Sequence, residues 1–386
     1  MKDFVNVAAD YVEDDDVILT TLAVFAQKGW FQNPVSGRLK DIAAGLSDGR
    51  GRSPALRREF AAAMRSWRPE DLEVMLKTAR MQDPGEEWRF SLAINRVFWH
   101  IGWKVEWTPL EQFVKRLSGS ANTHHCFVSF NYDLLLDRVL SLRTDWKAAD
   151  GYGVPIAWWA SAEEGAALDG QMSKPAGAFK PVDVRPLEGA KARNTHWTLL
   201  KPHGSLNWLL TDSKQNHKHS DELVLVLENG AISYFGPYEC RALRFPDWAV
   251  PVNAELPLLP PLSNKHELER RLHRDQVEVE RRALRDAAEV YLIGWSVPDT
   301  DKQQSELVSQ AMRRRATALE RLTVVTLEAT DDYFRRVGEL FAASERVIER
   351  HNRGFVEFVR AGDNWCSRVK NWLRRLARIE RGPVWS

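Results

Sequence analysis

Cysteine is scarce in this chain of 386 residues, which contains only Cys126, Cys240 and Cys366. They lie too far apart to form the closely spaced pairs of a zinc ribbon or the dense framework of a disulfide-stapled domain. We therefore predict no metal site built on cysteine and no disulfide. A reducing, cytoplasmic compartment is the simplest setting for such a chain.

Long apolar runs and an excess of one charge are also missing. No run approaches the roughly 20 apolar residues of a membrane-spanning helix, and the acidic start, MKDFVNVAADYVEDDD, does not follow the pattern of a signal peptide. The chain has 54 Lys and Arg residues against 53 Asp and Glu residues, so its formal net charge is +1. General nucleic-acid binding normally needs a strongly basic surface. We predict that neither a membrane nor a nucleic acid is the partner.

Helical patterns dominate the first third of the chain. Residues 17–31 carry apolar side chains on nearly every helical face, which predicts a well-buried helix. Pro69 and the acidic residues after it predict a helix start within residues 68–81. From residue 124 the pattern changes to β runs, and helix, strand, helix, strand recurs over residues 265–329. That alternation predicts βαβ units and a parallel sheet.

The length suits one large domain or two of medium size. We interpret residues 1–345 as one α/β domain and residues 346–386 as a C-terminal helical extension. Within the domain we predict a helical portion over residues 1–119 and an α/β portion over residues 124–345. The α/β portion contains two predicted insertions, residues 144–194 and residues 211–250. The first insertion is rich in Gly, Ala, Pro and Lys and is expected to be an irregular surface segment, whereas Asn229-Gly230 in the second predicts a two-residue hairpin turn.

Near the end of the chain, residues 366–381 predict a basic amphipathic helix. Such a helix either docks through its apolar residues, on the protein itself or on a partner, or contacts a nucleic acid. We favour docking, because the apolar residues recur at helical spacing and the charges fit a solvated face.

Polar groups follow three of the predicted strands, at the point where each strand ends. These groups are Asn131, Tyr132 and Asp133 after residues 127–130; His203, Gly204 and Ser205 after residues 198–202; and Gly294, Trp295 and Ser296 after residues 290–293. In a doubly wound sheet, ligands bind beyond the carboxyl ends of the strands. If the three strands are parallel neighbours, the groups converge on one crevice, which is the predicted site.

Each group also has a purely structural interpretation. Asp133 can cap the helix that follows it, and Asn131 can sit in a turn and bond its own backbone. His203-Gly204 can be a tight turn between two strands, and residues 294–296 can be an ordinary strand-to-helix connection. Because short motifs often occur by chance, local structure explains each group taken alone. Their joint occurrence favours a site.

The same segments resemble the sirtuin-like superfamily, in particular the bacterial sirtuin-like proteins that degrade NAD in anti-phage defence. FNYDLLLD resembles the strand-Asn-Tyr-Asp-helix motif of that branch, and KPHGSLNW resembles its His-Gly-Ser-x-Asn-Trp segment. LIGWSVPDTD resembles its Ile-Gly-Tyr-Ser-x-Pro-x-Thr-Asp segment, with Trp295 where the family often has Tyr or Thr. The resemblance covers roughly residues 124–345 in separate pieces, and the first two motifs are fairly specific as a pair.

The resemblance implies a Rossmann-like, mainly parallel sheet flanked by helices, with NAD as substrate or ligand. It implies hydrolysis of NAD to nicotinamide and ADP-ribose, with His203 as general base and Asn131 positioning the ribose and the water. Contacts to NAD are implied for Asn131, Tyr132, Asp133, Gly204, Gly294, Trp295 and Ser296. No metal is implied, because the four-cysteine zinc ribbon of the deacetylase sirtuins has no counterpart here. A homo-oligomer or a companion defence protein is the implied partner.

One family element has no clear counterpart in the sequence. Relatives open with a strand and a Gly-Ala-Gly-x-Ser loop that holds the cofactor's phosphates at a helix N-terminus. The nearest candidate, residues 49–53, does not follow a β run. Residues 1–16 resemble the helix that normally comes after that loop, which leads to the hypothesis that the chain starts late, by roughly 20–30 residues. The alternative is an inactive module that binds NAD or ADP-ribose metabolites, or a scaffold.

Overall fold

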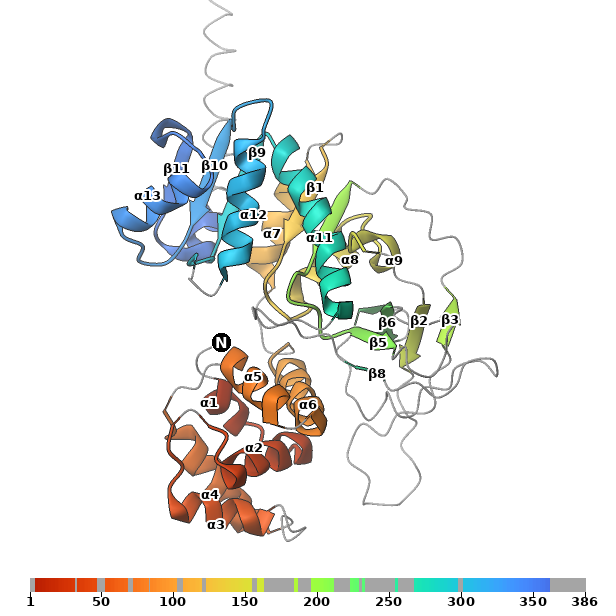
Figure 1. The fold of residues 1–386 in the computed structure, drawn as a ribbon, viewed down its shortest axis with the longest axis vertical. Coiled ribbons are helices and arrows are strands. Elements are labelled where there is room, and N and C mark those ends of the chain that lie inside the picture. The colour runs from red at the N-terminus through yellow and green to blue at the C-terminus, as the bar shows by residue number, and fades with distance from the viewer. Residues whose placement is uncertain are drawn as a thin grey trace, which may run out of the picture. The chain divides into compact units, whose positions relative to one another are not determined.

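The computed structural model describes residues 4–31, 33–46, 53–68, 72–82, 84–102, 107–119, 123–154, 158–162, 184–186, 196–211, 223–228, 231–232, 254–255, 267–297 and 301–361. The chain divides into two compact units. Unit 1 consists of Met1–Val105 and His124–Gln276, and unit 2 consists of Glu106–Thr123 and Val277–Ser386. Figure 1 shows the helices and strands of both units. The sequence predicted one domain over residues 1–345, and the chain groups into these two units.

Unit 1 begins with a group of helices. They are α1 (Phe4–Ala9), α2 (Asp16–Lys28), α3 (Gly37–Gly45), α4 (Pro54–Arg65), α5 (Leu72–Gln82) and α6 (Pro84–Gly102). Ser36 and Ser53 accept a backbone N–H in the first turns of α3 and α4, as N-cap residues do. Helix α2 is buried along most of its length, as predicted, and ends at Gly29 with a φ of 69°. These helices confirm most of the predicted helical portion.

A buried carboxylate holds the start of α2 against α6. Asp15 Oδ1 accepts the N–H of Val17 at 3.0 Å, while its Oδ2 lies 2.8 Å from Arg96 Nε and 3.0 Å from His100 Nε2. Burial by itself raises the pKa of Asp15, but the bonds from His100 and Arg96 outweigh burial and leave that pKa below its usual value. One side chain therefore caps one helix and pairs with another.

Two parallel strands follow in unit 1. Strand β1 (His125–Val128) pairs with β4 (Trp197–Leu200), and the register sets Phe127 opposite Leu199. Helix α8 (Leu135–Arg143) and the short α9 (Ala148–Gly151) come after β1. Two of the three strands named in the site prediction are therefore parallel neighbours, although β1 ends at Val128 and not at residue 130.

The two predicted insertions contribute to a second sheet of unit 1. Strand β2 (Trp158–Ala162) pairs with β3 (Val184–Pro186) and, in parallel, with β6 (Leu223–Glu228), and the order β3-β2-β6-β5-β8 adds β5 (Trp208–Thr211) and β8 (Ala254–Glu255). Strand β7 (Ala231–Ile232) pairs antiparallel with β6, with Glu228 opposite Ala231, which confirms the predicted hairpin spacing. The prediction of an irregular segment over residues 144–194 is wrong where β2 and β3 lie, because their pairing with distant residues is not visible in local composition.

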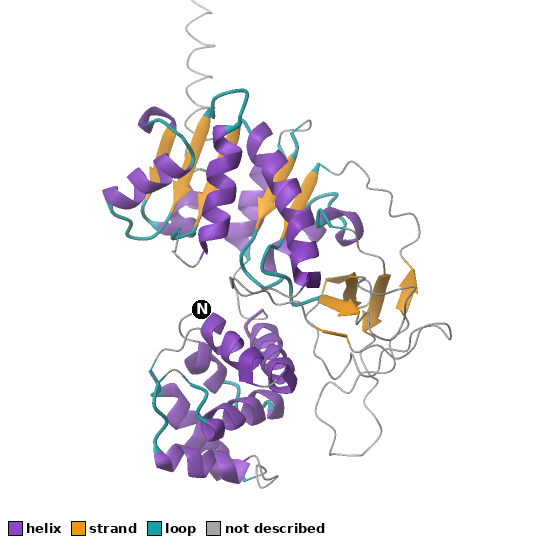
Figure 2. Cartoon of the chain, viewed as in Figure 1, coloured by secondary structure: helices purple, strands orange, loops and turns teal. Residues whose placement is uncertain are grey.

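Unit 2 is built around a parallel sheet with the order β11-β10-β9 (Figure 2). Strands β9 (Glu289–Ile293), β10 (Arg321–Val325) and β11 (Ile348–His351) are joined by α12 (Lys302–Arg313) and then by α13 (Asp331–Leu340) with a short 3-10 turn, η3 (Glu345–Val347). The central strand β10 is buried from Leu322 to Val325, as expected for a parallel strand covered on both faces. The predicted βαβ units are confirmed here.

Two boundaries differ from the predicted ones. Helix α7 (Thr108–Leu117) belongs to unit 2 and not to the N-terminal helical portion, because Phe113 packs on Tyr291, Phe355 and Phe358 with ring centroids 5.6–6.1 Å apart. Strand β11 lies inside the predicted helical extension over residues 346–386 and pairs with β10 instead. Residues 366–381 lie outside the described part of the chain.

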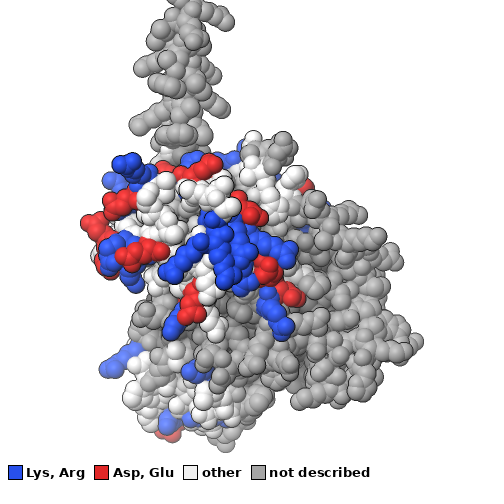
Figure 3. Space-filling view, turned by 45° about the horizontal axis from the view of Figure 1, so that its top comes forward, with Lys and Arg blue, Asp and Glu red and all other residues white. Residues whose placement is uncertain are grey.

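Basic side chains gather over helices α11 (Glu267–Asp286) and α12 (Figure 3). Arg281 and Arg282 share the carboxylate of Glu278, and Arg315 donates to the carbonyl oxygens of Leu284 and Ala287 at the end of α11. Cations at a helix C-terminus offset the partial negative charge of its free carbonyls. Within the described residues, no helix is both long and apolar enough to cross a membrane.

Candidate functional site

The predicted site residues of unit 1 lie at one edge of the β1–β4 pair. Both strands run in the same direction, and Ser129 N donates to Leu200 O at 2.9 Å just beyond the last paired residues. The chain therefore leaves β1 through residues 129–134 and leaves β4 through residues 201–207, side by side. Two segments separated by about seventy positions in the sequence form one edge of the sheet.

Two hydrogen bonds join these segments. Leu206 N donates to Tyr132 O at 3.2 Å, and Lys201 Nζ donates to Asp133 O. Both acceptors are backbone carbonyls of the turn that carries Asn131. The turn is therefore attached to the His203 segment on both sides of His203.

His203 lies among the aromatic neighbours of Asn131. Its ring centroid is 5.4 Å from that of Phe130 and 6.2 Å from that of Tyr132. The His203 side chain is 7% exposed and Tyr132 is 5% exposed, whereas Asn131 is exposed. The imidazole thus packs near the half-buried ring of Phe130 and the buried ring of Tyr132, and Asn131, which lies between these two residues in the chain, is exposed to solvent.

Gly204 shapes the turn that carries His203. Its φ is 84°, a left-handed conformation that residues with a Cβ rarely adopt. Its N–H donates to Lys201 O at 2.9 Å, which closes a tight turn between β4 and β5. The structural interpretation of His203-Gly204 as a turn is confirmed, and the same turn presents the imidazole at the sheet edge.

Asp133 is not the N-cap of α8, which is Leu134, but its side chain does bond the first turn of that helix. Its Oδ1 accepts the N–H of Leu135, the first residue of α8, at 3.0 Å. The carboxylate therefore satisfies one free N–H at the start of α8 from the residue before the N-cap. Burial raises the pKa of Asp133, although the nearby Lys201 ammonium opposes that rise.

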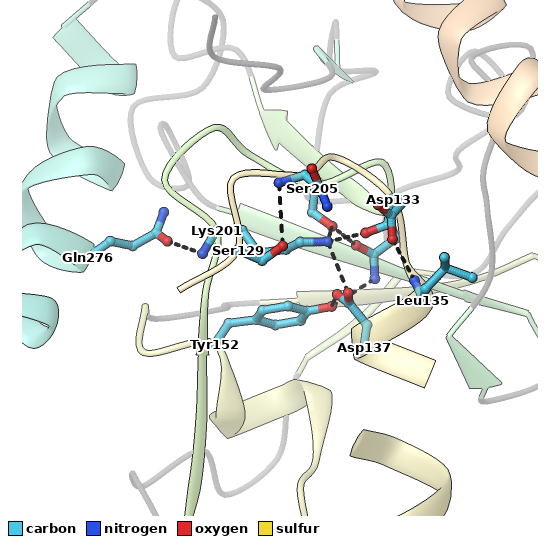
Figure 4. Close-up of polar contacts among 10 residues, drawn as sticks. Ser129, Asp133, Leu135, Asp137, Tyr152, Lys201, Ser205 and Gln276 are labelled. Atoms are coloured by element: carbon cyan, nitrogen blue, oxygen red, sulfur yellow. Dashed lines mark hydrogen bonds and ion pairs between the residues drawn. The ribbon is translucent and has the colours of Figure 1, made fainter. Parts of the chain in front are cut away.

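Beneath the edge lies a closed ring of polar side chains (Figure 4). It consists of Lys201, Asp137, Tyr152, Asn207 and Ser205, all 0% exposed. Lys201 Nζ donates to Asp137 Oδ2 at 2.9 Å and to Ser205 Oγ at 3.2 Å. Ser205 donates to Asn207 Oδ1 at 2.8 Å, Asn207 Nδ2 donates to Tyr152 Oη at 3.3 Å, and Tyr152 donates to Asp137 Oδ1. Burial and the Asp137 carboxylate raise the pKa of Tyr152 well above its usual value, so the phenol keeps its proton.

Sequence reasoning missed this ring. Three of its members, Lys201, Ser205 and Asn207, lie in the same KPHGSLNW segment as His203, and Asp137 interrupts an apolar helical run. Polar residues in such apolar surroundings were a signal that could have been used. Tyr152, in contrast, has no local signal, because only the fold brings it to Asp137.

The third predicted segment, residues 294–296, belongs to unit 2. Gly294 has a φ of 68° and its N–H donates to Val325 O at 2.9 Å. The Trp295 indole is 9% exposed and donates to Asp301 Oδ2 at 2.9 Å, whereas Ser296 is exposed. Trp295 therefore closes the loop onto the start of α12. The proximity of this segment to His203 stays a prediction.

The described residues contain no group of three or more His, Cys, Asp or Glu side chains that could hold a metal ion. A scan against protein-family models finds none that matches the chain, and a search of curated proteins gives no significant match. The candidate site is therefore defined by its own geometry: an imidazole, an exposed carboxamide and a left-handed glycine turn at one edge of a parallel strand pair.

Proposed function

We propose that this chain is a sirtuin-like protein that binds NAD at the carboxyl ends of β1 and β4 and hydrolyses its nicotinamide–ribose bond. One observation carries the proposal: the parallel pairing of β1 with β4 brings the His203 imidazole against Phe130 and Tyr132, the two chain neighbours of Asn131. A candidate base and a candidate positioning group thus share the sheet edge at which α/β proteins bind ligands.

Hydrolysis of this bond needs few protein groups. The electron pair of the bond between ribose C1′ and the nicotinamide nitrogen leaves with nicotinamide, and a water oxygen bonds to C1′ through an oxocarbenium-like transition state. The water must lose a proton, and an imidazole suits this step because its ordinary pKa lies near neutrality. In the proposal, His203 takes that proton and the exposed carboxamide of Asn131 orients the ribose and the water.

The remaining residues have supporting roles in the proposal. Gly204 lets the backbone approach the ligand closely, because it carries no Cβ. The backbone around Tyr132 and Asp133 lines the nicotinamide end. We also propose a cytoplasmic setting in anti-phage defence and a homo-oligomer or a companion defence protein as partner.

The test is nicotinamide release from NAD by the purified chain, measured by chromatography. We expect His203→Ala and Asn131→Ala each to lower turnover by about 100-fold or more, since positioned proton transfer contributes that much. His124→Ala is the matched control, because His124 is exposed and lies at the opposite, amino end of β1. Turnover that survives both site substitutions would contradict the assigned roles.

A binding module is the second candidate, favoured by the lack of a clear glycine-rich phosphate loop in the sequence. Calorimetric titration with NAD and with ADP-ribose separates the two. Binding without nicotinamide release by the unaltered chain identifies a binding module. If the unaltered chain binds neither ligand and releases no nicotinamide, the proposal as a whole is contradicted.

A further inference from the structure

Lys201 is the residue on which the segments around His203 converge. It is the first residue after β4 and precedes His203 by two positions. Its Nζ contacts three acceptors from three segments: Asp133 O in the Asn131 turn, Asp137 Oδ2 in the first turn of α8, and Ser205 Oγ beyond Gly204. An ammonium has three N–H donors, so each donor has one acceptor.

The acceptors of Lys201 are themselves fixed by the ring beneath the site. Hydrogen bonds run in one direction from Ser205 through Asn207 and Tyr152 to Asp137, and Lys201 donates to both ends of that path. A closed ring in which every member has its partner permits few other arrangements, because each alternative leaves a buried polar group without a hydrogen bond. The ammonium therefore has one well-defined position.

A catalytic role for Lys201 does not fit its burial. Lys201 and Ser205 resemble a nucleophile and its base, but both are 0% exposed and no substrate atom reaches them. A role in stability alone is a weak explanation, because a buried ion pair often contributes no more to stability than apolar residues of the same volume. What Lys201 does supply is a fixed link between the His203 turn and the Asn131 turn.

We propose that Lys201 is a positioning residue that holds the His203 turn against the Asn131 turn, and this inference rests on the proposed function of that site. The link is the bond from Nζ to Asp133 O, reinforced by the bond from Leu206 N to Tyr132 O. Without the ammonium, His203 moves relative to Asn131. A displacement of about 1 Å at a reacting group lowers a rate by as much as about 100-fold.

The first test uses the double variant Lys201→Met/Asp137→Asn. Removing both charges avoids leaving a buried carboxylate without a partner, which would destabilise the protein by itself. We expect kcat for NAD hydrolysis to fall by about 100-fold with KM changed less than about threefold. The surface pair Arg65→Met/Asp10→Asn, whose Nε–Oδ1 distance is 3.0 Å, removes the same charges elsewhere in unit 1 and is expected to change neither constant.

A second readout does not depend on activity. Histidine labelled with ¹³C at Cε1 gives one NMR signal per imidazole, and His203→Ala identifies the His203 signal. That signal is expected to be shifted by the rings of Phe130 and Tyr132, which lie 5.4 and 6.2 Å away. We expect the shift to collapse in the Lys201 double variant and to persist in the surface control. A failure of the proposed function leaves this readout intact, so the two failures can be told apart.

Tyr152→Phe separates positioning from general loosening. This substitution breaks the ring but leaves all three contacts of Lys201 Nζ. We expect a lower Tm, with the His203 shift and kcat reduced much less than in the Lys201 double variant, because the three bonds of Nζ remain. If the double variant does not fold, Ser205→Ala takes its place and is expected to reduce the shift partially. An unchanged shift in a folded Lys201 or Ser205 variant, or an equal loss in Tyr152→Phe, overturns the proposal.

Discussion

Gly204 is the residue whose backbone conformation places His203 at the edge of the strand pair. With a φ of 84°, it occupies a region in which a Cβ costs about 1–2 kcal/mol. We predict that Gly204→Ala lowers the free energy of unfolding by about that amount and also lowers turnover, because the turn relaxes and carries the imidazole away from Asn131. Urea denaturation and nicotinamide release measure the two effects.

Gly37→Ala is the control for the loss of a glycine as such. Gly37 is the first residue of α3, and a Cβ built on it meets no atom within 4 Å. Its replacement is expected to be neutral or slightly stabilising, by less than about 1 kcal/mol. A Gly204→Ala variant as stable as the Gly37 variant would show that the turn adapts without strain.

At the scale of elements, α11 and α12 meet through a buried acid. Glu280 is 2% exposed, and its Oε1 accepts a hydrogen bond from Gln304 Nε2 of α12. Burial raises the pKa of Glu280 to about 7, against the opposing effects of the Gln304 bond and the Arg281 charge. The folded protein therefore holds this proton more tightly than the unfolded chain, whose glutamates have a pKa near 4.5.

The sign of the pH effect follows from that difference. Between pH 4.5 and about 7 the unfolded chain has lost the proton and the folded protein has kept it, so the free energy of unfolding falls as the pH rises. The full effect corresponds to roughly 3 kcal/mol. We predict that Glu280→Gln, which places an N–H donor where the acid carries its proton, is more stable than the unaltered chain at pH 8, by up to that amount. The advantage disappears near pH 4.

Urea midpoints measured from pH 4 to pH 8 test this prediction. Glu278→Gln is the matched control on the same helix, because the Glu278 side chain is 45% exposed and its bonds to Arg282 and Arg281 lower its pKa. That variant is expected to gain no stability at pH 8. A Glu280→Gln variant that is less stable than the unaltered chain at pH 8 would contradict the assignment.

At the scale of the whole molecule, the division into two units assigns α7 to the C-terminal unit. Phe113 is 5% exposed and packs on Tyr291, Phe355 and Phe358. We predict that Phe113→Ala destabilises unit 2 by about 3–5 kcal/mol, the usual cost of removing a buried ring. Amides of β9 and of residues 354–361 are then expected to exchange hydrogen faster, with those of α1 to α6 unchanged.

Hydrogen exchange followed by mass spectrometry measures both halves of this prediction. Phe60→Ala is the reciprocal control, because Phe60 of α4 is 0% exposed and belongs to unit 1. It is expected to speed exchange among the N-terminal helices and to leave β9 protected. Equal loss of protection in both units after either substitution would show that they do not unfold as separate units.

The candidate site was predictable only in part. His203 and Asn131 were visible because each follows an apolar strand pattern, and two of the three strands that the prediction expected to be parallel neighbours, β1 and β4, are paired in this way. The ring that supports them was not predicted, because its bonds join residues as far apart as Asp137 and Lys201, and no local pattern reports such a bond. The predicted third strand end lies in unit 2, where β9 pairs with β10.

What the sequence determined by itself was local: the burial of α2, the βαβ alternation of unit 2 and the spacing of the β6–β7 hairpin. These features depend on periodicity, capping and turn chemistry, which act between residues a few positions apart. Only the tertiary structure decided that β4 lies beside β1, that β2 pairs with β6, and that α7 and β11 belong to unit 2. Strand partners and helix contacts are chosen by the free energy of burying surfaces brought together from distant parts of the chain, and that free energy has no signature in a short stretch of sequence.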